Sequence, residues 1–248
     1  MSKNAVPHQL GSKQNAKLST RILFWLIIAI IVIVTLHLIF QFLNLNVYNE
    51  LHGQIFELSN RFDLDDESSI GTWFSQAMFL SIAITAAIAG YLNKKRPIRR
   101  LWYLISVIGL VFSIDEVVSL HEFVLQSVHL ILFHENAPTF ISNSWWIFAP
   151  TILLLAIWLC YQVFKYLPKS TLRLFVAGAV MIVFGAVVVD AFGSALPKNS
   201  YASQGITIAI EESLEFLGTA TVLYAIVAYI EQNFAKKIQK TLSDLNEN

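Results

Sequence analysis

The chain has 248 residues, with 17 basic and 17 acidic side chains that leave no net charge. Hydrophobic residues make up 56% of it and charged residues only 14%, whereas a soluble domain has about 45–50% and about 25%. These values argue against a soluble domain, the absence of a basic patch argues against a nucleic-acid-binding protein, and a single cysteine, Cys160, excludes an internal disulfide and a cysteine-based zinc site.

Six apolar segments follow one another along the chain, each close to the roughly 20 residues that a helix needs to cross a bilayer. We predict an all-α fold, a polytopic membrane protein with a bundle of six transmembrane helices in residues 21–232 between tails 1–20 and 233–248. The predicted spans are 21–43, 70–92, 101–121, 145–165, 172–194 and 205–230. The acidic run 63–67 and Ser69 precede the second span, and we interpret them as a solvated helix start.

Basic side chains alternate between the connecting loops. Lys and Arg are frequent in both tails, in "NKKRPIRR" (93–100) and around Lys169, whereas loop 122–144 has none. Cytoplasmic loops are enriched in these residues. We therefore predict that both termini are cytoplasmic, in a cell membrane that we expect to be a bacterial inner membrane.

Ionisable residues enter the end of the third span, in "FSIDEVVSLHEF" (112–123). At about 100° per residue, Asp115, Ser119 and Glu122 share one helix face, with Glu116 and His121 on opposite sides of it. A polar face on a membrane helix turns toward protein or water rather than lipid.

Other spans carry polar residues at a similar depth. Glu211, Glu212 and Glu215 share a face of the last span, while Asp190 and His37 lie in the fifth and the first. With spans that alternate in direction, these residues all fall in the outer half of the membrane, and the inner half is nearly all apolar. We expect the third and the last span to be neighbours, with their acidic faces opposed.

The acidic residues would be costly if they stood alone, at about 2.5–3.5 kcal/mol for each ionised group near the bilayer centre. Protonation with raised pKa values, a water-filled cavity or a bound cation could each offset this cost. Acids and imidazoles without a basic partner favour a divalent metal ion such as Zn, Fe, Mn or Ca. The predicted metal ligands are His37, Asp115, His121, Glu122, Asp190, Glu211, Glu212 and Glu215.

Catalytic candidates come from the same third span: Asp115, Glu116, Ser119 and Glu122. The sequence contains no H-E-x-x-H, G-x-S-x-G or P-loop motif, and a serine within a helix is more often a packing residue than a nucleophile. For His37, the alternative to a metal ligand is a hydrogen bond to a helix carbonyl or to a neighbouring acid.

The motif Asp115-Glu116-x-x-Ser119-x-His121-Glu122, followed by Glu211-Glu212-x-x-Glu215, resembles a pattern in an uncharacterised family of bacterial multi-pass membrane proteins. The resemblance covers these two short segments and implies no activity.

Our first hypothesis for the function is a metal-dependent membrane enzyme that acts on a lipid or amphiphilic substrate, with the metal activating water or polarising an oxygen. A cation or proton-coupled transporter or channel is the alternative, although the apolar inner half offers little to continue a path. A non-catalytic membrane module that docks a partner is the third hypothesis. Membrane lipids are partners in all three.

Overall fold

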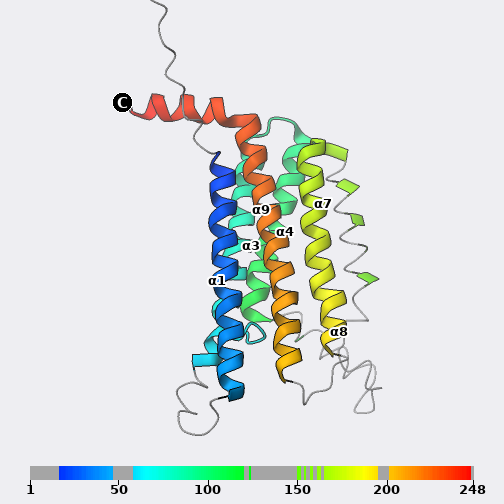
Figure 1. Ribbon diagram of the computed structural model, residues 1–248. Helices are drawn as coiled ribbons and strands as arrows, with labels where there is room; N and C mark the ends of the chain where they lie inside the picture. Colours follow the sequence, from blue (N-terminus) through cyan, green and yellow to red (C-terminus); the bar gives the residue numbers. More distant parts are fainter. Residues whose placement is uncertain are drawn as a thin grey trace, which may run out of the picture.

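The computed structural model describes residues 17–46, 58–119, 165–194 and 201–246, and single positions between 123 and 162. The helices are α1 (Leu18–Asn46), α3 (Ile70–Leu92), α4 (Arg96–Val118), α7 (Lys169–Val183), α8 (Asp190–Ser194) and α9 (Tyr201–Asn246), with a π-helical stretch, η1 (Phe184–Val189), between α7 and α8. The long helices lie side by side in one bundle (Figure 1). No strand occurs in these described ranges, so the predicted all-α class is confirmed there.

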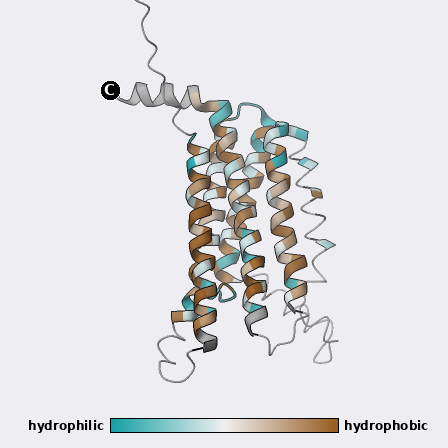
Figure 2. Cartoon of the chain, viewed as in Figure 1, coloured by the Kyte–Doolittle hydropathy of each residue, from teal (hydrophilic) through white to brown (hydrophobic). Residues whose placement is uncertain are grey.

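Five helical segments are long and apolar enough to cross a membrane: Leu18–Leu43, Ile70–Leu92, Arg96–Val118, Lys169–Gly193 and Gln204–Ala235. They coincide with five of the predicted spans. Much of their length is coloured as hydrophobic in Figure 2, and many of their large apolar side chains are exposed on the bundle. The remaining predicted span, 145–165, lies largely outside the described residues. The described positions within it, such as Leu154 and Trp158, are helical and exposed, but the predicted number of six is not confirmed.

Local sequence explains where several helices begin and end. The Ser69 hydroxyl accepts a hydrogen bond from the Thr72 backbone N–H at 3.2 Å, and so caps α3 as predicted. Asn93 ends α3, because both its backbone N–H and its amide donate to the Ala89 carbonyl. α9 continues to Asn246, well past the predicted end of the last span.

The bundle has two chemically different ends. We call the end where α3 meets α4 and where α7 begins the basic end, with Lys94, Lys95, Arg96, Arg99, Arg100, Lys169 and Arg173. We call the opposite end the acidic end, with Asp63, Asp65, Asp115, Glu116, Asp190, Glu211, Glu212 and Glu215. The polar colouring in Figure 2 is accordingly concentrated near the two ends of the helices.

Helix α9 packs against α1, α3 and α7, whereas α4 packs mainly on α3. α4 nevertheless meets α9 through side chains, because the rings of Trp102 and Tyr229 lie 4.8 Å apart and Glu116 lies within electrostatic reach of Glu212 and Glu215. The third and the last span are therefore neighbours, as expected, although α4 packs mainly on α3. Glycines allow the closest of these approaches: a Cβ on Gly178 of α7 would lie 2.7 Å from the Gly218 carbonyl oxygen of α9, and the reverse holds for Gly218.

Two apolar clusters fill the bundle. The larger lies toward the basic end and contains Trp102, Ile226 and the fully buried Ala86, Ala89 and Ala225. The smaller lies toward the acidic end, where the rings of Phe74 and Phe216 meet edge to face at 5.5 Å. This smaller cluster separates the acidic side chains from the rest of the core.

Candidate functional site

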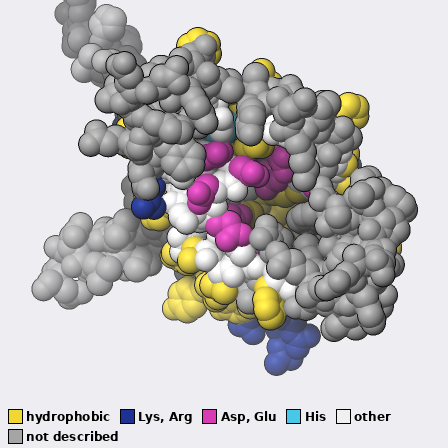
Figure 3. All heavy atoms as spheres, turned by 90° about the horizontal axis from the view of Figure 1, so that it is seen from below, with side chains coloured by type: hydrophobic (Ala, Val, Ile, Leu, Met, Phe, Trp, Pro, Cys, Tyr) yellow, Lys and Arg dark blue, Asp and Glu magenta, His cyan; other side chains and the backbone are white. Residues whose placement is uncertain are grey.

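The acidic side chains come together from four separate parts of the chain. Glu211, half-buried on α9, lies within electrostatic reach of Asp190 at the start of α8 and of Asp65 in the turn before α3. Glu215, one turn further along α9, is within reach of Glu116 on α4 as well as of Asp190 and Glu211. Viewed from the acidic end, acidic side chains gather near the middle of this face (Figure 3).

Glu212 belongs to the same group, because Glu215, Glu211, Glu116 and Asp65 all act on it. Among the described residues, the charged groups that act on these three glutamates are all carboxylates. Carboxylates at such short range repel one another when they are ionised. The acidic end therefore favours either protons or a cation between them.

Glycines bring the α7–α8 segment against α9 at this point. A Cβ on Gly185, within η1, would lie 2.9 Å from the Glu211 carbonyl oxygen, and a Cβ on Gly193 would lie 3.0 Å from a methyl carbon of Thr207. The π-helical stretch ends where Asp190 begins α8. Because a π-turn holds one residue more than an α-turn, it rotates everything after it, and such turns are frequent at functional sites. It thereby contributes to the position of Asp190.

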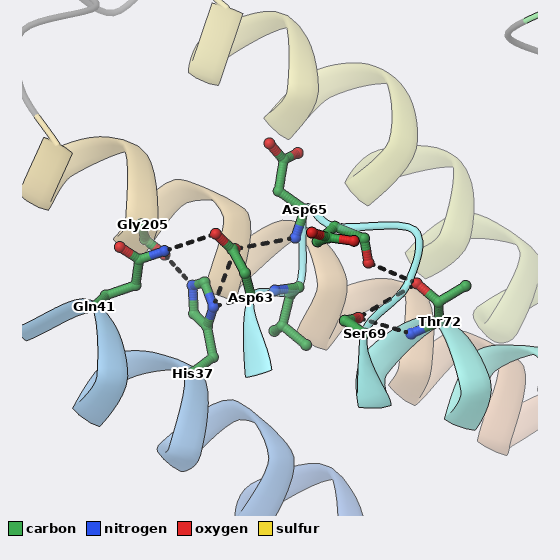
Figure 4. A network of polar contacts seen from close by, with 9 residues as sticks. His37, Gln41, Asp63, Asp65, Ser69, Thr72 and Gly205 are labelled. Atoms are coloured by element: carbon green, nitrogen blue, oxygen red, sulfur yellow. Dashed lines mark hydrogen bonds and ion pairs between the residues drawn. The ribbon is translucent and has the colours of Figure 1, made fainter. Parts of the chain in front are cut away.

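His37 of α1 joins three segments in a buried network (Figure 4). Its Nε2 lies 3.1 Å from the Gly205 carbonyl oxygen of α9. Its Nδ1 accepts a hydrogen bond from the Leu64 backbone N–H at 3.2 Å and lies 3.6 Å from Asp63 Oδ1. A carbonyl can only accept, so Nε2 carries the proton and Nδ1 offers its lone pair to Leu64. The imidazole is therefore neutral and has no lone pair left for a metal ion.

The turn between α1 and α3 is held by its own acidic residues. Asp63 accepts hydrogen bonds from the Gln41 amide and from the Asp65 backbone N–H. The carbonyl of Asp66 accepts from the Thr72 hydroxyl. These bonds use Asp63 and Asp66 within the turn, whereas the Asp65 carboxylate points away from His37 (Figure 4).

Asp65 lies at the acidic end, in the turn before α3, and its side chain is exposed. The protein atoms around it, followed by the charges of Asp63 and Asp190, nevertheless raise the pKa of the Asp65 carboxyl above its ordinary value of 3.8.

On α4, Glu116 accepts a hydrogen bond from the Ser75 hydroxyl of α3 at 3.0 Å. Asp115 is half-buried beside it. Ser119 adopts a left-handed conformation (φ 49°, ψ 42°) and its N–H donates to the Asp115 carbonyl at 2.7 Å. This conformation ends α4 before the predicted limit of the span.

The structure thus brings together Glu116, Asp190, Glu211, Glu212 and Glu215 from the predicted site, with Asp115 and Ser119 nearby on α4. Two further predicted residues, His121 and Glu122, lie outside the described residues. Within the described ranges, no three His, Cys, Asp or Glu side chains are arranged so that they could hold a metal ion. The predicted metal site is not supported by this arrangement, and the His37 hydrogen bond to a helix carbonyl is the alternative that the sequence left open.

The sequence analysis missed the turn residues Asp63 and Asp65, which it assigned to a solvated helix start. A signal was available: the loop of residues 44–69 has a single basic residue, Arg61, and lies on the same predicted side of the membrane as the acidic helix faces. A loop on that side can fold back onto the bundle near the acidic residues. The contacts of Leu64 and Asp63 with His37 show that the described part of this loop does so.

Residues 25–229 match a family model described as a domain of unknown function, DUF8692. No curated protein and no solved structure matches the chain. The match covers more than half of the chain, so the chain belongs to the DUF8692 family, which agrees with the expected uncharacterised family.

Proposed function

We propose that this protein is a multi-pass membrane protein whose acidic end opens at the outer face and binds a divalent cation, as part of a metal-dependent reaction on a lipid or amphiphilic substrate. The observation that carries the proposal is the convergence of Asp65, Glu116 and Asp190 on the three α9 glutamates. Among the described residues, the charged groups that act on these glutamates are all carboxylates. A charge of +2 between them relieves their repulsion.

The chemistry of the site favours a hard cation. Carboxylate oxygens suit Mn and Ca better than they suit Zn, and the one imidazole that the structure describes there, His37, uses both nitrogens elsewhere. The carboxylates act on one another without forming a ready set of three ligands. A partly hydrated ion fits such an arrangement, because bound water fills the coordination positions that the carboxylates leave open.

The orientation follows from the distribution of basic residues. The Lys and Arg side chains of the basic end fall into the loops that the positive-inside rule assigns to the cytoplasm. The acidic end then faces outward. An amphiphilic substrate could approach it with its polar group at the membrane surface and its apolar chain in the lipid, where a metal-bound water can react.

A transport path is the second candidate, and the core weighs against it. Directly beneath the carboxylates, Phe74, Phe216, Met78 and Ala220 are buried in the smaller apolar cluster. The larger cluster around Trp102 follows toward the basic end. A path for ions or protons through the described helices would need polar groups where these apolar side chains pack.

Metal analysis of the purified protein tests the proposal. Protein prepared without a chelator should contain near-stoichiometric divalent metal, and a Glu211→Ala/Glu215→Ala variant that still folds should lose it. Glu231→Ala is a matched control, because this glutamate lies on the same helix but contacts Ser19 at the other end. Metal-free wild-type protein whose thermal stability ignores added Zn, Fe, Mn and Ca would contradict the proposal.

A further inference from the structure

We propose that His37 is a positioning residue: as a neutral imidazole protonated on Nε2, it joins the turn Asp63–Ser69 to α1 and α9 through two hydrogen bonds, which we call the clasp. The clasp holds Asp65 beside the acidic residues of α8 and α9 at the acidic end. The role of Asp65 rests on the proposed function above, whereas the clasp itself does not.

The clasp depends on two directional bonds from one ring. His37 is fully buried, it lies 3.1 Å from the Gly205 carbonyl oxygen through Nε2, and it accepts from Leu64 N–H at 3.2 Å through Nδ1. The partners are backbone atoms, so they cannot rotate away, and each would be left without this bond if the ring were lost. A buried N–H that loses its acceptor destabilises the folded state, and this applies above all to the N–H of the buried Leu64.

Several contacts show that the groups around the His37 ring are closely packed against one another. Gly205 lies against Gln41, which is one helical turn beyond His37 on α1, and a Cβ at Gly205 would meet the Gln41 side chain at 3.3 Å. Gln41 in turn donates to Asp63 at 3.2 Å. On the other side of Leu64, a Cβ at Gly71 would lie 2.5 Å from a Leu64 methyl carbon. The Leu64 side chain is therefore wedged against α3 while its N–H is held by α1.

The clasp fixes the direction of the next residue. Leu64 is buried and anchored, and the Asp65 N–H donates to Asp63 Oδ1. The Asp65 side chain then projects away from His37 toward the acidic residues of α8 and α9, with which it interacts electrostatically (Figure 4). Loss of the Leu64 bond would free the turn at the residue that precedes Asp65.

Two single substitutions separate the two bonds of the ring. Asparagine places an acceptor close to the Nδ1 position, so His37→Asn should keep the Leu64 bond and lose the Gly205 bond. Glutamine places a donor close to the Nε2 position, so His37→Gln should keep the Gly205 bond and lose the Leu64 bond. Backbone hydrogen exchange at Leu64, read by fragmentation mass spectrometry, measures the result directly.

We expect Leu64 exchange to remain slow in the wild type and in His37→Asn, and to accelerate about tenfold or more in His37→Gln, which is the scale of one lost hydrogen bond. The α3 amides serve as the internal control for folding. In ¹⁵N spectra of the wild type, the His37 signal should show a protonated Nε2 and a bare Nδ1. Unchanged Leu64 exchange in His37→Gln, or a protonated Nδ1, would overturn the clasp.

Mn²⁺ binding by the same variants tests the role of Asp65. If the clasp acts through Asp65, then His37→Gln and Asp65→Asn should each weaken Mn²⁺ binding, and the double variant should bind no more weakly than Asp65→Asn alone. Effects that simply add would show that His37 does not position Asp65. If the wild type binds no Mn²⁺, the proposed function fails, while the exchange and the ¹⁵N spectrum still decide the clasp.

Discussion

At the basic end of the bundle, hydrogen-bonded polar pairs join α9 to its neighbours, whereas at the acidic end carboxylates from four segments face one another. Glu231 accepts hydrogen bonds from both the backbone N–H and the hydroxyl of Ser19, and Tyr229 donates to the Asn93 side chain at 3.1 Å. These pairs fasten α9 to α1 and to the end of α3. The acidic end instead gathers side chains of like charge, which repel one another when they are ionised.

The difference extends to packing. Toward the basic end, alanines let three helices close around Trp102, and toward the acidic end the glycines of η1 and α8 bring carboxylates together. The first arrangement gains contacts between apolar atoms, while the second gathers groups that repel. Substitutions at the two ends should therefore have opposite consequences for stability.

The largest loss of stability is expected at the basic end, for Trp102→Ala. The side chain is fully buried against Tyr229 and Phe175, so its removal should cost about 3–5 kcal/mol of unfolding free energy. Trp102→Phe should cost far less, because the indole Nε1 has no hydrogen-bond partner among the residues that the structure describes. Reversible unfolding in mixed detergent micelles measures both. An equal cost for the two variants would show that the indole N–H matters more than the packing.

A methyl group at the α7–α9 contact should have the next largest effect. In Gly178→Ala the new Cβ would meet backbone atoms of α9 at 2.7 Å, so we expect a loss of about 1–3 kcal/mol. Gly205→Ala is the matched comparison, because its Cβ would meet only the flexible Gln41 side chain at 3.3 Å. The same unfolding measurement should rank Gly178→Ala well below Gly205→Ala in stability. The reverse order would mean that α7 and α9 do not depend on this contact.

Glutamates at the two ends of α9 give the sharpest contrast. Glu231→Gln weakens two hydrogen bonds to Ser19 and should cost about 1–2 kcal/mol. Glu215→Gln removes a carboxylate on which, within the described part of the chain, the acting charges are other carboxylates. It should leave the stability of the metal-free protein unchanged or raise it. A destabilisation by Glu215→Gln as large as that by Glu231→Gln would remove the distinction between the two ends.

The smallest effect concerns Asp65 and depends on pH. Its folded-state pKa is raised above 3.8, so between 3.8 and the raised value the folded state binds more protons than the unfolded state does. The unfolding free energy then falls as pH rises through this window. Asp65→Asn should therefore stabilise the protein at neutral pH, by less than about 1 kcal/mol for so exposed a charge. The gain should vanish below pH 3.8, and melting curves at several pH values will show whether it does.

The sequence was sufficient for those features that depend on length and periodicity. Apolar length predicted five spans that the structure describes, and the helical period placed Glu211, Glu212 and Glu215 on one side of α9. The cap at Ser69 was readable because the hydroxyl and the Thr72 N–H that donates to it lie three residues apart. Each of these features is decided within a few residues of chain.

Features that depend on contacts between distant segments could not be predicted in the same way. The central place of α9 follows from glycine contacts such as Gly178 with Gly218, which leave no periodic signal. The π-helical stretch before Asp190 and the clasp on Leu64 arise from tertiary packing. His37 was predicted as a metal ligand, with a hydrogen bond to a helix carbonyl or to a neighbouring acid as the alternative. Only the positions of Gly205 and Leu64 show that it bonds these two backbone groups.

The central claim is that the carboxylates of the acidic end bind a divalent cation together, and a titration with Mn²⁺ tests it most directly. The free ion can be counted by its electron paramagnetic resonance signal while wild-type, Glu211→Gln/Glu215→Gln and Glu231→Gln proteins are titrated in lipid nanodiscs. The account predicts saturable, near-stoichiometric binding by the wild type and by Glu231→Gln, and its loss in the double variant. Equal binding by all three proteins, or none by the folded wild type, would contradict it.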